Sequence, residues 1–232
     1  MAAGTTVRPY HHGDLRGALV AAALERTRTG GPAGLSLREV TRDVGVSPAA
    51  AYRHFADRGQ LLAAVAHEIQ QRMAARMRTR MRAPRDADRH TRALLRLRGV
   101  GLGYVAFAVA EPGWFETAFF DTLSTSRTVG ADGRPVGGAA EAVPPPFALL
   151  TAALDDLVAA GGLAPARRLD AELSCWSAVH GCAELIVHGP LRGADPGTVR
   201  RVTERVVDDI VVGVTAAPPT THRSGPDVGD GP

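Results

Sequence analysis

The chain has 232 residues, and 45% of them are hydrophobic. This length and composition allow one large domain or two small ones with buried cores, and they exclude a chain that is disordered throughout. No window approaches the roughly 18 uninterrupted apolar residues of a membrane span, and the first residues lack the apolar run of a signal peptide. We therefore expect a cytoplasmic protein that makes no membrane contact.

Charge is divided unevenly along the chain. Residues 1–100 contain 18 arginines and 8 acidic residues, a net charge of +10, whereas residues 101–232 contain 9 arginines and 16 acidic residues, a net charge of −7. A strongly basic half indicates a polyanionic partner, either nucleic acid or an anionic membrane surface. The chain has no lysine, which suggests a coding bias toward arginine and makes each single arginine weaker evidence.

The N-terminal part of the sequence predicts helices, and no part of the chain carries a strand signal of any length. Asp14 is placed to cap a first helix, which ends at the two glycines and the proline of residues 30–32. Ser36 and Glu39 then have the spacing of a capping box, in which each side chain accepts a hydrogen bond from a free backbone N–H. A short second helix is expected to follow.

A turn at Gly45 separates the second helix from a third. Ser47 is placed to cap the third helix, and Pro48 opens it at a position where its missing N–H costs nothing. Asp57 begins a fourth helix that runs to about Met81. Two helices joined by a short glycine turn form a helix-turn-helix unit, whose second helix lies in the DNA major groove.

The third helix carries its large side chains at one end. Residues 48–50 are a proline and two alanines, so the backbone can approach DNA closely and offer methyl groups to thymine. Tyr52, Arg53 and His54 follow with groups that bind phosphate oxygens or, for Arg53, a guanine edge. The alternative is an ordinary helical corner with a solvated polar face.

The segments YHHGDLRGALVAAALE and LSLREVTRDVGVSPAAAYRHFADRGQLLAAV resemble the N-terminal DNA-binding domain of TetR-family transcriptional regulators. The resemblance covers residues 10 to about 67 without gaps, and it rests on the capping box of the second helix combined with the GVS, Y-x-H-F and L-L-x-A-V motifs. It implies a three-helix DNA-binding domain over residues 9–56 and a double-stranded DNA operator as partner. The implied DNA contacts are Ser36, Arg38, Ser47, Pro48, Ala49, Ala50, Tyr52, Arg53, His54 and Arg58.

Two positions depart from the pattern of the family. Pro48 stands where the family often has lysine, so one polar or phosphate contact is lost. Ala51 stands where a larger aliphatic residue is usual, and we expect a more loosely packed core there.

The same resemblance implies a helical ligand-binding and dimerisation domain over residues 57–215, which makes about nine helices in an all-α fold. A fifth helix is expected to start near Arg89 and to break at residues 111–113. Residues 124–146 are rich in glycine and proline and predict a mobile loop. Further helices are expected at residues 147–160, 168–187 and 195–214, and residues 216–232 predict a disordered tail.

Most of the sparse aromatic residues gather around the break after the fifth helix. Such a cluster either lines an apolar ligand cavity or forms plain core. Because the family resemblance implies a small-molecule effector, we take these residues as candidates for its pocket. The candidates from this cluster are Tyr104, Phe107, Trp114, Phe115 and Phe119, and Trp176 and His180 of a later helix are added to them.

The last two helices carry apolar stripes that suit helix packing. One stripe runs from Leu173 to Val187 and the other from Val199 to Val214. Trp176-x-x-x-His180-Gly181 resembles a WHG-type motif found in one C-terminal subgroup of the family, in which these helices pair about a two-fold axis. We expect a homodimer, because two half-sites on DNA call for a symmetric protein; the alternative is packing within one chain only.

No pattern in the sequence indicates an enzyme, a cofactor or a metal site. Cys175, His180, Cys182 and His188 do not share one helical face, and no phosphate-binding glycine loop or paired carboxylates are visible. The sequence therefore predicts a DNA-binding transcriptional regulator, a repressor that a small-molecule effector releases from its operator. The alternative is a helical protein that binds a hydrophobic ligand and does not bind DNA specifically.

Overall fold

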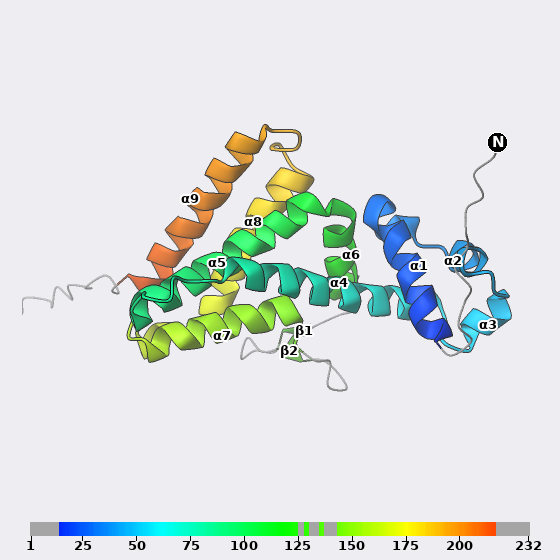
Figure 1. Ribbon diagram of the computed structural model, residues 1–232, viewed down its shortest axis with the longest axis horizontal. Helices are drawn as coiled ribbons and strands as arrows, with labels where there is room; N and C mark the ends of the chain where they lie inside the picture. Colours follow the sequence, from blue (N-terminus) through cyan, green and yellow to red (C-terminus); the bar gives the residue numbers. More distant parts are fainter. Residues whose placement is uncertain (1–13, 125–127, 130–134, 137–142, 217–232) are drawn as a thin grey trace, which may run out of the picture.

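The computed structural model describes residues 14–124, 128–129, 135–136 and 143–216 (Figure 1). These residues form nine α-helices, and the fold is all-α as the sequence predicts. The helices are α1 (Leu15–Gly30), α2 (Leu37–Val44), α3 (Pro48–Tyr52), α4 (Arg58–Arg80), α5 (Arg89–Ala110), α6 (Pro112–Ser124), α7 (Pro145–Ala159), α8 (Ala171–Val187) and α9 (Pro196–Thr215). Two 3-10 turns, η1 (Pro32–Gly34) and η2 (Pro165–Arg167), precede α2 and α8.

Side-chain caps at four predicted helix starts are confirmed. Each capping side chain accepts a hydrogen bond from the backbone N–H three residues later, at Asp14, Ser47, Asp57 and Asp195. The predicted capping box is wrong, because the Ser36 side chain makes no cap hydrogen bond. Its other member, Glu39, instead accepts a hydrogen bond from Arg26 of α1 at 2.7 Å. This ion-paired bond competes with the backbone N–H for the same carboxylate, and it joins α2 to α1.

Two very short strands interrupt the helices at a place where the sequence gives no strand signal. β1 (Thr128–Val129) and β2 (Pro135–Val136) pair antiparallel, with Thr128 opposite Val136. They lie inside the predicted mobile loop, whose remaining residues up to 142 fall largely outside the described part of the chain. The predicted disordered tail also lies outside it, except for Ala216.

α4 and α5 pack closely along their lengths. A Cβ atom added to Gly103 of α5 would stand 2.8 Å from the Met77 Cα atom of α4, so only glycine lets the two backbones approach this closely. α5 is long and apolar enough to span a membrane by composition alone. However, 56% of its apolar window is buried inside the protein, which is typical of a core helix.

The N-terminal helices share their core with the start of α4. α1 contacts both α2 and α4, and the buried side chains include Leu19, Val40, Phe55 and Leu61. Ala51 is fully buried among them. We call α1 to α3, together with the first turns of α4, the head. From the head, α4 continues into the C-terminal helices (Figure 1). The predicted domain boundary between residues 56 and 57 remains a prediction. In the structure, the first turns of α4 contribute to the core of the head.

Candidate nucleic-acid interface and ligand pocket

The turn between α2 and α3 has the backbone geometry that a helix-turn-helix unit needs. Gly45 adopts a left-handed conformation with φ 75° and ψ 31°, which glycine reaches without a steric penalty. The N–H groups of Gly45 and Val46 donate to carbonyls of the last turn of α2, at Arg42 and Thr41. The glycine therefore ends α2 and turns the chain directly into α3.

α3 divides its residues between core and solvent. Ala51 and Phe55 are buried, whereas Tyr52 is 56% exposed. Arg53 and His54 are also exposed, but α3 ends at Tyr52, so these two residues lie in the turn that follows. Further exposed or half-buried candidates lie at the N-terminal ends of α2 and α3, at Ser36, Arg38, Ser47, Pro48, Ala49 and Ala50.

Arg58 differs from the other candidate DNA contacts because its side chain is used inside the head. Its Nε donates to the Leu35 carbonyl at 2.8 Å, and its Nη2 donates to the Pro32 carbonyl. These bonds hold the start of α4 against the segment that leads into α2. A DNA contact by Arg58 remains a prediction, and its remaining guanidinium nitrogen, Nη1, is the group that this conformation offers for it.

Ion pairs join α1 to α2. Arg26 of α1 donates to Glu39 at 2.7 Å and to Asp43 at 2.5 Å, both on α2. The Arg26 hydrogen bond holds the pKa of the Asp43 carboxyl below its usual range. The helix-turn-helix is therefore presented by a braced three-helix head.

A buried carboxylate joins this head to the C-terminal helices. Glu111 lies at the break between α5 and α6, and its side chain is only 5% exposed. It accepts hydrogen bonds from Arg28 of α1 at 2.7 and 3.0 Å and from Arg76 of α4 at 3.1 Å. Beside it, the Trp114 indole N–H donates to the Leu24 carbonyl of α1 at 2.8 Å. Glu111 and Trp114 thus tie α1 to the first turn of α6.

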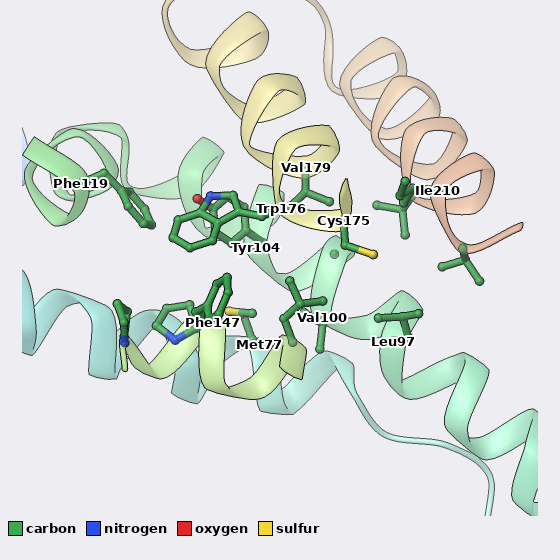
Figure 2. Close-up of a pocket in the computed structure, with 16 residues that line it drawn as sticks. Met77, Leu97, Val100, Tyr104, Phe119, Phe147, Cys175, Trp176, Val179 and Ile210 are labelled. Carbon is green, nitrogen blue, oxygen red and sulfur yellow. The ribbon is translucent and has the colours of Figure 1, made fainter. Parts of the chain in front are cut away.

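Helices α4 to α9 all contribute to a narrow apolar pocket (Figure 2). Three of the seven predicted pocket residues line it: Tyr104, Phe119 and Trp176. His180 lies behind them, where its Nδ1 accepts a hydrogen bond from the Tyr104 hydroxyl at 2.8 Å.

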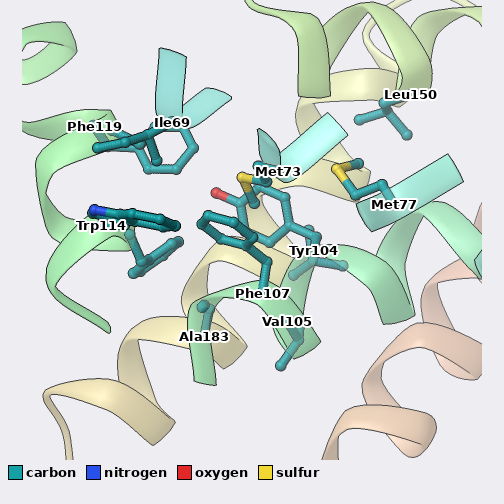
Figure 3. Close-up of a cluster of buried hydrophobic side chains, with 14 of the residues drawn as sticks. Ile69, Met73, Met77, Tyr104, Val105, Phe107, Trp114, Phe119, Leu150 and Ala183 are labelled. Atoms are coloured by element: carbon teal, nitrogen blue, oxygen red, sulfur yellow. The ribbon is translucent and has the colours of Figure 1, made fainter. Parts of the chain in front are cut away.

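The other three predicted pocket residues do not line the pocket. Figure 3 shows Phe107 and Trp114 in the buried cluster that also holds Tyr104 and Phe119. Phe107 and Phe115 are almost fully buried core residues, and Trp114 faces α1. Sequence reasoning also missed Phe147, whose ring centroid lies 5.0 Å from that of Trp176. Its spacing of three residues from the buried Leu150 was the available signal. No pattern of neighbouring residues indicated that α7 packs against α8.

The stripe expected on α8 is divided in the structure. Ala183 is fully buried, and Trp176 lines the pocket. The exposed apolar positions on α8 are instead Leu173 and Leu185, with Gly181 between them on the same face. On α9, Ile210 lines the pocket and Val214 is buried.

Two family models match the sequence and decide its family. The model for bacterial regulatory proteins of the tetR family matches residues 19–65, and the model for a tetracyclin repressor-like C-terminal domain matches residues 97–210. The chain belongs to the TetR family. It is thus a transcriptional regulator with an N-terminal DNA-binding helix-turn-helix domain and a C-terminal helical domain, as the sequence motifs predict.

Solved structures share this TetR-like fold over most of their length. A protein of unknown function from Rhodococcus sp. RHA1 is 28% identical, with a TM-score of 0.62 over 90% of this chain and 100% of its own. A putative tetR family regulator from Shewanella sp. PV-4 is 18% identical, with a TM-score of 0.58 over 87% and 98% of the two chains. A single-residue variant of TetR from Acinetobacter baumannii AYE, in complex with minocycline, is 16% identical, with a TM-score of 0.56 and the same coverage. No curated protein matches the chain.

Among the residues that the structure describes, no group of three or more histidine, cysteine or acidic side chains is placed to hold a metal ion. Cys175 and Cys182 are both buried free thiols. Burial raises the pKa of Cys175 to about 11, so this thiol stays protonated at neutral pH.

Proposed function

We propose that this TetR-family protein is a cytoplasmic repressor that binds operator DNA as a homodimer, needs no cofactor and is not an enzyme. A small-molecule effector that binds in the pocket lined by helices α4 to α9 releases the protein from DNA. The observation that carries the proposal is the exposed end of the helix-turn-helix. There, α3 begins with the small side chains of residues 48–50, and the exposed Tyr52, Arg53 and His54 follow. Ion pairs between α1 and α2 support this part of the head.

In this proposal the DNA contacts are divided between base reading and phosphate binding. Ala49 and Ala50 face base edges in the major groove, where their methyl groups meet thymine. Tyr52, Arg53 and His54 bind phosphates and fix the position of the head on the duplex. Ser36, Arg38, Ser47, Pro48 and Arg58 border the same surface.

Exposed apolar residues on α8 and α9 support self-association. Leu173 and Leu185 are 45% and 48% exposed, and Val212 is 66% exposed. Large apolar side chains exposed along a helical surface favour a protein interface there. A second copy that pairs α8 and α9 about a two-fold axis would cover this face and present two heads to two operator half-sites.

The connection between pocket and head supports release by an effector. Tyr104 of α5 and Phe119 of α6 line the pocket, and the break between these helices carries Glu111, which binds Arg28 of the head. A ligand that binds one arrangement of α5 and α6 more tightly than another therefore also changes the position of α1. The free energy of operator binding weakens by at most the difference between the ligand's binding free energies for the two arrangements.

The direct test is fluorescence anisotropy of the purified protein on DNA taken from immediately upstream of its own gene, with a scrambled fragment for comparison. Specific recognition predicts binding to the native fragment that is about a thousandfold tighter. Equal, salt-sensitive binding to both fragments would contradict sequence-specific regulation at this site. Absence of binding near physiological salt would favour a protein that binds a hydrophobic ligand only.

A matched pair of arginine variants tests which end of the molecule meets DNA. Arg53→Gln removes a charge at the end of α3, so we expect weaker binding to all DNA sequences. The slope of the logarithm of the binding constant against the logarithm of the salt concentration should also become smaller by about one. Arg89→Gln makes the same change at an exposed position at the start of α5, and we expect no effect. Equal effects of the two variants would mean that only net charge matters.

A further inference from the structure

An open groove with a volume of about 450 Å³ lies between α5 and α9. This volume is within the range of small-molecule sites. The groove is separate from the pocket described above, because the two use different sides of α5. Tyr104 lines the pocket, whereas Leu102 and Val109 line the groove on the far side of the helix.

The groove forms because α5 and α9 pack tightly at one end only. A Cβ atom added to Gly101 of α5 would stand 3.0 Å from a Val207 methyl group of α9. Close to this contact, Arg98 donates to Asp208 at 2.6 Å and closes that end of the groove. From there the two helices diverge (Figure 1), and α5 is left partly uncovered.

The floor of the groove is apolar and elongated. On α5 its residues follow the three-to-four spacing of one helical face, from Leu102 to Ala110, which spans about 12 Å at 1.5 Å per residue. Val109 is 41% exposed there. An extended apolar molecule on this floor would be removed from water, which favours binding. The floor residues of α5 are Leu102, Val105, Ala106, Val109 and Ala110.

The charged side chains that border the groove are Arg80 at the end of α4 and Arg200 and Glu204 on α9. All three are exposed. Neither arginine side chain makes a hydrogen bond or an ion pair within the described part of the chain, whereas the neighbouring Arg98 is paired. Two positive charges against one negative charge favour an anion, and a carboxylate would form charge-assisted hydrogen bonds with the free guanidinium groups.

We infer that the groove between α5 and α9 is a second binding site, which takes an elongated apolar molecule with one carboxylate, such as a medium-chain fatty acid. Arg80 and Arg200 bind the carboxylate, and the apolar chain lies along the floor of α5. This ligand class rests on the groove alone and does not depend on the function proposed for the pocket.

The proposed homodimer would leave this groove open. Val212, which is exposed on α9, follows Thr203 of the groove by nine residues. Nine residues make about two and a half helical turns, so the two side chains lie on opposite sides of α9. A partner that covers Val212 therefore does not cover the groove.

The test compares probes that share one apolar chain and differ in charge. They are octanoate, octanol and octylammonium, with acetate as an anion that lacks the apolar chain. Isothermal titration at pH 7.5 measures each dissociation constant on the whole wild-type chain. We expect octanoate to bind at least about tenfold more tightly than octylammonium, a difference that corresponds to about 1.4 kcal/mol. Octanoate should also bind more tightly than octanol, and acetate should show no measurable binding.

Charge variants on α9 locate the carboxylate. Arg200→Gln should weaken octanoate binding about two- to fivefold, as expected for one exposed ion pair, and leave octanol binding unchanged. Glu204→Gln removes the competing acid and should tighten octanoate binding. Arg201→Gln changes the next arginine, which is exposed and does not border the groove, and should match the wild type.

A filling variant locates the apolar chain. Ala106→Phe places a ring on the floor and should abolish octanoate binding, whereas Ala75→Phe adds the same ring at an exposed site on α4 and should not. Octanoate binding that persists in Ala106→Phe would overturn the inference. So would equal binding of octylammonium and octanoate, equal effects of Arg200→Gln and Arg201→Gln, or failure of octanoate to bind. None of these measurements involves DNA, so this site and the proposed repression are tested separately.

Discussion

Glu111 shows how one residue connects the two parts of the molecule. Its side chain is 5% exposed, yet the guanidinium groups that it pairs with, those of Arg28 and Arg76, are about half exposed. Arg28 also lies over the Trp114 ring, 5.2 Å from its centroid. The carboxylate therefore depends on both arginines to offset its burial, because a buried charge without a partner is costly.

Replacing Glu111 by glutamine should weaken the contact between α1 and α6. Glutamine keeps the shape but loses charge-assisted hydrogen bonds, and we expect the free energy of unfolding to fall by about 1–3 kcal/mol. Urea denaturation followed by circular dichroism measures this change. Asp209→Asn, which breaks the exposed pair with Arg205 on α9, should change little and serves as the control. A Glu111→Gln variant as stable as the wild type would show that the arginines contribute nothing there.

His180 should make stability depend on pH. Burial lowers its pKa in the folded protein below the ordinary value of 6.5, and Glu184 beside it opposes this only in part. As the pH falls below about 6.5, the unfolded chain binds a proton that the native protein resists, so stability decreases. Above that pH both states are neutral and the effect is absent.

Urea unfolding at pH 7.5, 6.5 and 5.5 measures this dependence. His180→Asn, which has an amide oxygen that can accept the Tyr104 hydroxyl, should lose less stability than the wild type between pH 6.5 and 5.5. His67→Asn changes an exposed histidine of α4 and should follow the wild-type curve. An unchanged slope in His180→Asn would contradict the assignment.

At the scale of elements, the contact between α4 and α5 depends on glycine. Gly103→Ala would place a methyl group 2.8 Å from the Met77 Cα atom, so the helices must move apart, and we expect a loss of about 1–3 kcal/mol. Thermal unfolding measures it. Gly213→Ala on α9 meets no atom within 4 Å in the subunit and should be neutral or slightly stabilising. Equal stability of the two variants would mean that α5 shifts without cost.

At the scale of the whole molecule, Gly181 tests the proposed homodimer. A Cβ atom at this position meets nothing within 4 Å in its own subunit, although the residue lies in the middle of α8. Gly181→Leu should therefore leave the subunit folded but hinder close approach of a partner's helices, which raises the dimer dissociation constant in analytical ultracentrifugation. Ala63→Leu makes a similar addition at an exposed site on α4 and should not change it. An unaffected dimer would place the interface elsewhere.

The sequence by itself determined the class of fold, the helix starts and the exposed end of α3. These features depend on neighbours a few residues away: Asp14, Ser47, Asp57 and Asp195 cap the helices that directly follow them. The family followed from such local motifs as well. Local signals also misled where a distant partner competes, and Glu39 binds Arg26 in place of completing a capping box.

Only the tertiary structure decided which aromatic residues line the pocket and what joins the head to the rest. The Tyr104–His180 bond joins residues 76 positions apart, and the Arg28–Glu111 bond spans 83. Phe107, Phe119 and Trp176 are all aromatic residues of helices, yet Phe107 lies in the core and the other two line the pocket. An aromatic residue and its neighbours in the sequence do not indicate whether its side chain is enclosed in the core or borders a pocket. That depends on how the six helices α4 to α9 pack together.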